Sequence, residues 1–344
     1  MDVSVVILAY GEEEWLLESV SSALASEGVT VEVVIVDNGA SKQAIASVRD
    51  LPRVTVLEPG ANLGFAGGVN VGVEATRAPV VVLLNSDAHV APDALRILRD
   101  DALAPGAGIV GALILLAEEP DQVNSAGNPL HVLGLSWAGR MGEDASDIVE
   151  PTAAASASGA CLAMARALWD RLGGFDAAYF AYLEDMEISW RTHQLGLPVM
   201  VQPNARAWHH YEFSRTPIKM YLLERNRLLF LLTVHQRRTL ALLAPPLLAL
   251  EVAMLAVAAR QGWARQKVRG WWWLATNLRH VARRRRVVQA SRTVPDAELT
   301  GFLTARFAAT QMGLPPGGGA LETALGVYWS GVKRWVPSHL PRRP

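Results

Sequence analysis

Residues 80–88 read VVVLLNSDA, five aliphatic side chains followed at once by polar ones. Five aliphatic residues in a row, three of them β-branched, are typical of a strand that is buried on both faces of a mainly parallel sheet. Ligands of open α/β sheets bind just beyond the carboxyl ends of such strands, where Asp87 stands. The Asp87 carboxylate is therefore a candidate ligand for a divalent cation, which can bridge diphosphate oxygens. The alternative is that Asn85, Ser86 and Asp87 form a turn that caps the next segment.

Similar apolar runs alternate with helical patterns along the first two thirds of the chain. This alternation predicts an α/β fold with a doubly wound, mainly parallel sheet. The first strand ends without a G-x-G-x-x-G fingerprint, so a dinucleotide site of the Rossmann type is not expected. Residues 118–151 are rich in Gly, Asp, Glu and Ser and are expected to form a long loop region. Strands are expected at 3–8, 31–36, 54–57, 80–84, 109–116, 158–164 and 197–202, and helices at 12–25, 41–51, 92–103, 167–172 and from Glu184 onward.

Composition narrows the class of protein. A length of 344 residues allows a large core and about two domains. The net charge of −1 gives no indication of a nucleic-acid partner. A single cysteine, Cys161, rules out an internal disulfide framework, and we expect it to be a small buried residue.

Two more polar segments follow predicted strands. Asp37 ends the second strand, where its carboxylate could hydrogen-bond a ribose or a base edge, or cap a helix that begins near Ser41. Residues 62–72 read NLGFAGGVNVG, in which four glycines would weaken an ordinary helix. This glycine density favours a backbone that approaches a ligand closely, with the N–H groups of a helix N-terminus facing an anion. The alternative is a tight loop packed against the sheet.

Two later clusters carry candidate catalytic and metal-binding groups. Glu184 and Asp185 follow an aromatic segment, residues 179–182, which would place both carboxylates in an apolar wall. The third acid of this cluster, Glu187, is explained by an i,i+4 ion pair with Arg191. Two adjacent histidines, residues 209–210, stand between aromatic side chains, and one of them is a candidate metal ligand.

The segment from Val3 to about Arg227 resembles the family 2 glycosyltransferases of GT-A fold, and among them the bacterial rhamnosyltransferase-like branch. Each motif alone is weak, but their order and spacing over two thirds of the chain make the match specific. The motifs are VVILAY (5–10), VIVDN (34–38), NLGFAGGVN (62–70), LNSDA (84–88), GGFD (173–176), YLEDME (182–187) and ERNR (224–227).

The resemblance implies a nucleotide-sugar donor, a divalent cation (Mg²⁺ or Mn²⁺) and inversion at the anomeric carbon. It implies a glycosyltransferase domain over residues 1–227, with a nucleotide-binding half (1–105) and an acceptor half (106–227). Asp185 would be the base, with Glu184 beside it in the acceptor site. One departure is Asn85, which replaces the first acid of the D-x-D signature and leaves one fewer charge for the nucleotide or the metal. The other implied contacts are Ala9, Tyr10, Glu12, Asp37, Asn62, Gly64, Asn70, Asn85, Ser86 and Asp87 to the donor, Gly174, Phe175 and Arg191 to the acceptor, and Asp87 with His209, or His210 as second choice, to the metal.

The last third of the chain, residues 228–344, is predicted to be helical and membrane-associated. Residues 239–259 are nearly all apolar and long enough to span a bilayer. The pair Pro245-Pro246 breaks this run and, with Glu251, argues for helices that lie in the membrane interface. Three tryptophans at 271–273 and four arginines at 283–286 suit an anionic cytoplasmic leaflet. The alternative is a helical hairpin packed on the catalytic domain. Beyond a loop at 315–319, another amphipathic helix is expected around Trp329 and Trp335.

These features predict a peripheral or monotopic enzyme at the cytoplasmic face of the cell membrane, with a span possible at 239–259. The acceptor would be a glycan or a polyprenyl-linked glycan of envelope or polysaccharide synthesis. A nucleotidyltransferase is the second hypothesis, but it usually begins with a Gly-rich loop bearing Lys or Arg, whereas residues 9–13 are acidic. A non-catalytic membrane adaptor is the third, and loss of Asp87 or Asp185 would have supported it.

Overall fold

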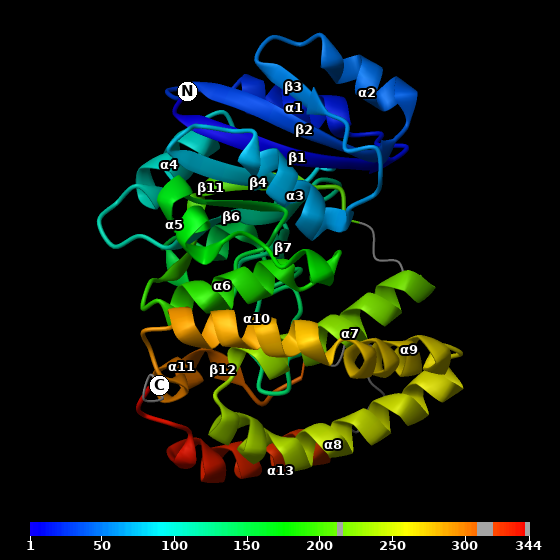
Figure 1. Ribbon diagram of the computed structural model, residues 1–344. Coiled ribbons are helices and arrows are strands. Elements are labelled where there is room, and N and C mark those ends of the chain that lie inside the picture. The colour runs from blue at the N-terminus through cyan, green and yellow to red at the C-terminus, as the bar shows by residue number, and fades with distance from the viewer. Residues whose placement is uncertain (212–215, 308–318, 341–344) are drawn as a thin grey trace. The chain divides into compact units, whose positions relative to one another are not determined.

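The computed structural model describes residues 1–211, 216–307 and 319–340, so most of the predicted loop at 315–319 lies outside the described residues. The chain folds into two compact units, coloured in chain order in Figure 1. The predicted domain boundary near Arg227 falls inside helix α7 (Pro217–Val234). The first unit comprises Met1–Asn128, Ala138–Thr192 and Leu197–Phe213, and the second Pro129–Trp137, His193–Gly196 and Ser214–Pro344.

The first unit is built on a ten-stranded sheet whose main path runs β3-β2-β1-β4-β10-β6-β11-β5. Strands β1 to β4 pair in parallel, whereas β10 runs antiparallel between β4 and β6, so the sheet is mixed. The strands are β1 (Val3–Gly11), β2 (Val31–Ala40), β3 (Val54–Leu57), β4 (Val80–Leu84), β5 (Ala88–Val90), β6 (Ile109–Leu116), β7 (Val123–Ser125), β9 (Thr152–Ala153), β10 (Cys161–Ala165) and β11 (Val199–His209).

Helices cover both faces of this sheet because every central strand is apolar on both sides. Val5 and Ile7 of β1 pack in the core formed with α1, α2 and α4, while Val6 and Leu8 face α3. All five residues of β4 are buried, which confirms the strand predicted at 80–84. The helices of this unit are α1 (Leu16–Leu24), α2 (Lys42–Arg49), α3 (Gly64–Glu74), α4 (Ala94–Ala102), α5 (Arg166–Leu172) and the first part of α6 (Glu184–Gln194), with short 3₁₀ turns at Ala145–Asp147 and Ala177–Tyr179.

Residues 64–74 form a regular helix, α3, in spite of their glycines. A Cβ atom at Gly68 would overlap with the side chain of Leu8, and one at Gly72 would overlap with Val6. These two glycines therefore allow the helix to lie directly on the sheet. For Gly68 and Gly72 the expectation of a backbone held open for a ligand is wrong, because the sheet fills that space.

The region predicted as a long loop, residues 118–151, is more ordered than its composition suggests. It contains β7, the short strand β8 (Leu130–His131) and a 3₁₀ turn, and the residues of β7 and β8 are buried. These strands have only three and two residues, so any alternation of polar and apolar side chains is too short to reveal them in the sequence.

The second unit is mainly helical. Its helices are α7, α8 (Arg237–Arg260), α9 (Ala264–Thr276), α10 (Leu278–Ser291), α11 (Asp296–Leu299) and α13 (Gly319–Val332), with 3₁₀ turns at Thr300–Phe302 and Lys333–Trp335 and a two-stranded sheet of β8 and β12 (Leu303–Thr304). Helix α7 packs against α9 and α10. The helix expected near Trp329 is α13, and Trp329 belongs to an apolar core with Leu243 and Leu250 of α8.

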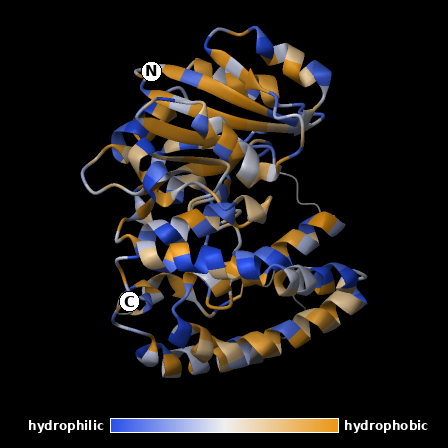
Figure 2. Cartoon of the chain, in the orientation of Figure 1, coloured by the Kyte–Doolittle hydropathy of each residue, from blue (hydrophilic) through white to orange (hydrophobic). Residues whose placement is uncertain are grey.

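Helix α8 runs without interruption through Pro245 and Pro246, so the break expected at this pair is wrong. Each proline removes one backbone hydrogen bond, but Leu243 and Leu250 are packed in the core on either side of the pair. Figure 2 shows hydrophobic residues along most of α8. Among the described residues, α8 is the one helix that is long and apolar enough to cross a membrane.

Glu251, the acid within this apolar helix, is not isolated. Its carboxylate lies 3.0 Å from Lys267 Nζ, accepts a hydrogen bond of 2.6 Å from Trp271 Nε1 and pairs with Arg227. Lys267 and Arg227 also pair with Glu224, so two acids and two bases neutralise one another. A buried acid is tolerated when it is paired in this way.

Candidate active site

The carboxyl ends of β1, β2 and β4 meet at one edge of the sheet. Parallel pairing places Ala9 of β1 opposite Asp37 of β2. Asp37 Oδ1 accepts hydrogen bonds from the backbone N–H groups of Gly39 (3.0 Å) and Ala40 (2.9 Å) and stabilises the turn after β2. The helix cap predicted as an alternative for Asp37 is supplied by Ser41, whose hydroxyl accepts from Ala44 N at 3.2 Å.

Tyr10 is the exposed member of the predicted donor contacts on β1. Its ring is 61% exposed, whereas Ala9 is buried, so only the backbone of Ala9 could meet a ligand. Glu12 is also exposed, and its carbonyl accepts from the hydroxyl of Ser41 at 3.2 Å.

Asp87 and His209 lie side by side where strands β5 and β11 pair. Strand β5 pairs with β11 so that Ala88 lies opposite His209. This pairing brings Asp87 Oδ1 to 3.1 Å from His209 Nε2, and Asn85 Nδ2 lies 3.4 Å from the same nitrogen. The predicted metal ligands Asp87 and His209 are thus in direct contact.

The chemistry of this pair fits a divalent cation. His209 Nδ1 lies 3.2 Å from Asn124 Oδ1, which accepts its hydrogen. The other nitrogen, Nε2, then presents a lone pair to the Asp87 carboxylate. A lone pair beside a carboxylate oxygen is a ligand set for a cation, and the hydrogen bond from Nδ1 fixes the ring for that purpose. The sequence does not predict that Asn124 contacts His209, because Asn124 lies in the segment predicted as a loop.

Glu13 is a further residue of this edge that the sequence did not single out. Its carboxylate accepts hydrogen bonds from the backbone of Tyr10 and from the side chain of Ser86, and it lies near enough to Asp87 for their charges to repel. Burial raises the pKa of the Glu13 carboxyl. Glu13 stands in the left-handed region at φ 55°, which turns its side chain back toward the strand end.

Asp185 lies next to the turn that carries Asp87. Asp185 Oδ2 accepts from Gly159 N at 3.0 Å, and its Oδ1 accepts from Met186 N at 2.7 Å. The neighbour of Gly159, Ala160, accepts a hydrogen bond from Asn85 N at 2.9 Å. Asp185 and the predicted metal-binding turn are therefore joined through two hydrogen bonds and one short stretch of backbone.

Glu184 is buried and Asp185 is half-buried, and the two carboxyl groups differ in their hydrogen-bond partners. Burial raises the pKa of Glu184, and the adjacent Asp185 raises it further, to about 8. Burial also raises the pKa of Asp185, while its backbone donors, Gly159 first, oppose that rise. Glu184 Oε2 has no hydrogen-bond partner within the described residues. Burial and the adjacent carboxyl group therefore oppose a second negative charge on this pair, and backbone N–H groups stabilise the charged form of Asp185.

The loop before this acidic pair is strained. Phe180, Tyr182 and Leu183 adopt positive φ angles of 63°, 71° and 69°. Each such conformation costs a non-glycine residue about 1–3 kcal/mol, and such residues cluster at functional sites. The carbonyl of Phe180 accepts from Ala66 N at 3.0 Å, which ties this loop to the start of α3.

The N-terminus of α3 does not offer free N–H groups as expected. Leu63 N donates to Asn38 Oδ1 at 2.7 Å, and Gly64 N donates to Asn62 Oδ1 at 2.8 Å. With Ala66 N on the loop carbonyl, three donors of this turn are bonded within the protein. The expectation that these three donors face an anion is wrong, because two side-chain amides and the Phe180 carbonyl already accept their hydrogens.

Asn62, Gly64 and Asn70 have contacts that explain them without a ligand. A Cβ atom at Gly64 would overlap with Phe180, and Gly64 has φ +70°. The Asn70 amide bonds both backbone groups of Phe175, at 2.9 and 3.0 Å.

The predicted acceptor contacts Gly174, Phe175 and Arg191 are likewise accounted for by the fold. Arg191 is buried and donates to Glu187 and to the carbonyls of Leu172 (2.6 Å) and Gly174 (2.6 Å). It thus caps the end of α5. The predicted ion pair between Glu187 and Arg191 is confirmed at 2.8 Å.

His210, the second choice for the metal, points elsewhere. Its ring stacks on Trp15 with 3.7 Å between ring centroids, and its nitrogens face Glu18 and Glu118. Only its backbone meets the predicted metal site, where His210 N donates to the carbonyl of Asp87 at 2.9 Å. Cys161, the predicted buried cysteine, is fully buried, and burial raises its pKa to about 12, so it is no nucleophile.

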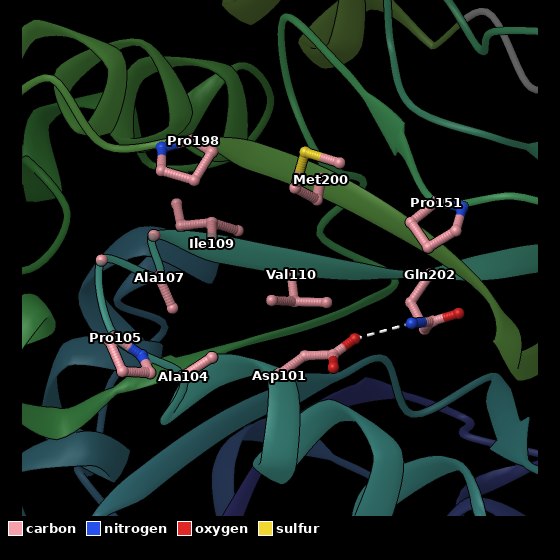
Figure 3. Close-up of a pocket in the computed structure, with 12 residues that line it drawn as sticks. Asp101, Ala104, Pro105, Ala107, Ile109, Val110, Pro151, Pro198, Met200 and Gln202 are labelled. Carbon is pink, nitrogen blue, oxygen red and sulfur yellow. Dashed lines mark hydrogen bonds between the residues drawn. The ribbon is translucent and has the colours of Figure 1, made fainter.

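A pocket of about 310 Å³ lies at the opposite ends of the strands from the candidate site (Figure 3). Ile109 begins β6 and Met200 stands near the beginning of β11, so the pocket is at the amino ends of these strands. Gln202 donates to Asp101 there at 2.7 Å. Ligands of such sheets bind at the carboxyl ends, so this pocket is not the candidate active site.

The raised pKa of Glu184 predicts a measurable effect on stability. The native state keeps the Glu184 proton up to a pH of about 8, whereas an unfolded chain releases it near pH 4.3. Stability therefore falls as pH rises through this window. Glu184→Gln stays neutral, so we expect its Tm, relative to that of the wild type, to rise by several degrees between pH 5 and pH 9, at about 2–4 °C per kcal/mol. Thermal unfolding across this range, with the exposed Glu27→Gln as control, checks the prediction, and a pH-independent difference would contradict it.

Comparisons with known proteins identify the family of this chain. The family described as Glycosyl transferase family 2 matches residues 4–172. The N-acetylglucosaminyl-diphospho-decaprenol L-rhamnosyltransferase of Mycobacterium tuberculosis (strain CDC 1551 / Oshkosh) is 32% identical over 221 residues, which cover 56% of this chain and 71% of that protein. The succinoglycan biosynthesis protein ExoO of Rhizobium meliloti (strain 1021) is 40% identical over 111 residues, 31% of this chain and 32% of that protein. The chain thus spans about a third of the length of ExoO.

Solved structures share the fold at low sequence identity. GalNAc-T7 with UDP, GalNAc and Mn²⁺ has a TM-score of 0.55 and 17% identity, over 67% of this chain and 48% of that chain. The mannosyltransferase PcManGT from Pyrobaculum calidifontis with GDP-Man and Mn²⁺ has a TM-score of 0.50 and 16% identity, over 97% of this chain and 87% of that chain. These likenesses show a GT-A glycosyltransferase fold. By its family match and by its identity to the M. tuberculosis protein over most of that protein's length, the chain belongs to glycosyltransferase family 2.

Proposed function

We propose that this protein is an inverting glycosyltransferase that uses a divalent cation, Mg²⁺ or Mn²⁺, to move a sugar from a nucleotide-diphosphate donor to an acceptor hydroxyl. The observation that carries the proposal is the contact of Asp87 with His209 at 3.1 Å, at the carboxyl ends of the strands and next to Asp185. A nucleotidyltransferase is less favoured, because the curated relatives named above act in glycosyl transfer or polysaccharide synthesis.

In this proposal Asp87 and His209 hold the cation, and Asn124 orients the His209 ring. A bound divalent cation would neutralise charge on the departing nucleotide diphosphate. Asn85 supplies an amide at the same place, where a second acid would add charge. The exposed Tyr10 ring and the turn after Asp37 are the proposed contacts for the nucleoside.

Asp185 is the proposed base. As the bond from the anomeric carbon to the diphosphate oxygen breaks, the acceptor oxygen forms a new bond to that carbon from the opposite side. The acceptor hydroxyl gives its proton to the Asp185 carboxylate in the same step. Glu184, kept neutral by burial, leaves the single charge on Asp185 and is placed to donate a hydrogen bond to the acceptor. One displacement inverts the anomeric configuration.

The proposed acceptor is a glycan linked to a polyprenyl diphosphate, and the proposed sugar is a hexose of the rhamnose type. Support comes from the name of the M. tuberculosis relative, which specifies rhamnosyl transfer to N-acetylglucosaminyl-diphospho-decaprenol. The test is transfer from a panel of sugar nucleotides to N-acetylglucosaminyl-diphospho-polyprenol, read by mass and by the anomeric configuration of the product. Transfer with inversion is expected from at least one donor. Transfer with retention would overturn the mechanism, and failure of every donor would overturn this choice of acceptor and sugar.

A lipid-linked acceptor implies work at the membrane surface, and we assign the membrane contact to α8 at the cytoplasmic face. Only 11% of the apolar window of this helix is buried inside the protein. Leu248 and Val252 are 67% and 70% exposed. These two residues are four positions apart and so lie on one face of α8, which suits an interfacial helix, and Trp272 of α9 is also exposed.

The double variant Leu248→Gln/Val252→Gln should bind lipid vesicles with anionic headgroups at least about tenfold more weakly than the wild type, because two apolar side chains no longer enter the bilayer. High salt should release the wild type only partly, since apolar burial persists when charge is screened. Vesicle sedimentation measures both effects. Val149→Gln is the matched control, because Val149 is 69% exposed on the first unit. A wild type that does not sediment, or a control that loses binding equally, would contradict the assignment.

A further inference from the structure

A second group of potential metal ligands lies close to the proposed active site but does not include Asp87 or His209. Glu18 on α1, His89 on β5 and His210 after β11 place their ligand atoms within 4.8 Å of one another. Glu18 Oε1 is 3.4 Å from His89 Nδ1, and Glu18 Oε2 is 3.4 Å from His210 Nε2. One carboxylate thus faces two imidazole nitrogens, each with its own oxygen.

Neither contact is a hydrogen bond. Within the described residues, His89 Nδ1 and His210 Nε2 are buried atoms with no hydrogen-bond partner. A buried ring nitrogen that faces a carboxylate would normally donate a hydrogen to it. Here both nitrogens point at Glu18 but stay outside hydrogen-bond geometry, which leaves this polar cluster unsatisfied.

Glu118 determines which nitrogen of His210 carries the hydrogen. His210 Nδ1 lies 2.8 Å from Glu118 Oε1, and the carboxylate oxygen accepts the hydrogen of this nitrogen. The other ring nitrogen, Nε2, faces Glu18. A carboxylate that accepts from the far nitrogen of a ligating histidine is a common arrangement in metal sites.

Stacked aromatic rings hold both histidines in place. The His210 ring stacks on Trp15 with an interplanar angle of 2°, and the His89 ring stacks on Trp208 with 5.3 Å between centroids. The site is therefore oriented before any ligand arrives.

The distances suit a small transition-metal ion. Two ligand atoms that each lie about 2.1 Å from a tetrahedral Zn²⁺ are about 3.4 Å apart. Both Glu18–histidine separations have this value. Two imidazoles and one carboxylate favour Zn²⁺ over Mg²⁺, because Mg²⁺ prefers oxygen ligands and keeps most of its waters.

We propose that Glu18, His89 and His210 form a Zn²⁺ site, with Glu118 as the carboxylate that orients His210. This site is separate from the Asp87–His209 pair and does not depend on the proposed function. Its metal would join α1, β5 and the end of β11, three segments distant in sequence. Because His210 N donates to the Asp87 carbonyl at 2.9 Å, the site would also brace the turn that carries Asp87.

The test uses the full chain, freed of metal and titrated with Zn²⁺ by calorimetry and with Co²⁺ by visible absorption. We expect one Zn²⁺ per chain at this site and the d–d bands of a low-coordinate Co²⁺ complex. Glu18→Gln and His89→Gln should each weaken binding by about 100-fold or more, and Glu118→Gln by about 10–100-fold. Glu118 is largely exposed, so its variant keeps the test valid if a ligand variant fails to fold.

Two controls separate this site from the proposed catalytic cation. Glu14→Gln alters an exposed acid of the same segment and should leave Zn²⁺ binding unchanged. Asp87→Asn should also retain it, because Asp87 is no ligand here. The proposal is overturned if the wild type binds no Zn²⁺, or if Asp87→Asn loses the metal while Glu18→Gln and His89→Gln keep it.

Discussion

Asp185→Asn should lower the single-turnover rate of sugar transfer by about 10²–10⁴, the usual cost of losing a general base. The amide has nearly the same shape, but it cannot take the acceptor proton. Donor affinity should change little, because the donor contacts that we propose lie at the ends of β1, β2 and β4. The measurement is single-turnover transfer beside calorimetric donor binding.

Two comparisons make the assignment of the base specific. Asp170→Asn changes an exposed acid on α5 and should transfer at the wild-type rate. Glu184→Gln should lose less activity than Asp185→Asn, because Glu184 is already neutral at pH 7 in this account. A Glu184→Gln variant without activity beside an active Asp185→Asn would mean that the base is the other acid of the pair.

Asp87→Asn should abolish metal-dependent transfer, as should removal of the cation from the wild type by excess EDTA. The charge that develops on the departing diphosphate would have no counter-charge at the strand ends. Addition of Mg²⁺ or Mn²⁺ should restore the EDTA-treated wild type but not the variant. The measurement is initial transfer rate across a cation titration.

Asp93→Asn is the matched control for this prediction, because Asp93 is an exposed acid six residues beyond Asp87 that offers no side-chain cap to α4. It should behave like the wild type at every cation concentration. Full activity of the wild type in excess EDTA would contradict metal dependence.

The strands could be predicted from the sequence because burial on both faces leaves a continuous apolar run, as in residues 80–84. What such runs cannot reveal is strand direction. β10 looks like its neighbours in sequence, yet it enters antiparallel between β4 and β6 and makes the sheet mixed. The direction of β10 depends on the path of the connecting segment before it, and that segment has no clear periodicity from which its path could be predicted.

Glycine-rich residues 64–72 illustrate a different limit. The same composition suits a ligand-facing loop and a helix that packs closely on a sheet. The close approach of Gly68 to Leu8 and of Gly72 to Val6 shows that these glycines serve helix packing. Only the three-dimensional neighbour distinguishes the two interpretations.

Candidate site residues could be predicted where they stand in a local motif, and could not where the fold brings them from other segments. Asp87, Asp185 and His209 stand in recognisable motifs. Asn124 and Glu13 reach the same edge through contacts that no local pattern encodes. For Arg191 the sequence predicts the ion pair with Glu187 but not the two hydrogen bonds to backbone carbonyls, because those partners come from another segment.

The central claim is that Asp87 and His209 form a cation-dependent donor site and that Asp185 acts separately on the acceptor. Calorimetric titration of sugar nucleotides into the wild type, Asp87→Asn and Asp185→Asn, each with Mn²⁺ and with EDTA, tests it most directly. We expect a donor that binds the wild type and Asp185→Asn only with Mn²⁺, and that binds Asp87→Asn weakly under both conditions. Equal donor binding by Asp87→Asn and the wild type in Mn²⁺, or binding that is unchanged by EDTA, would contradict it.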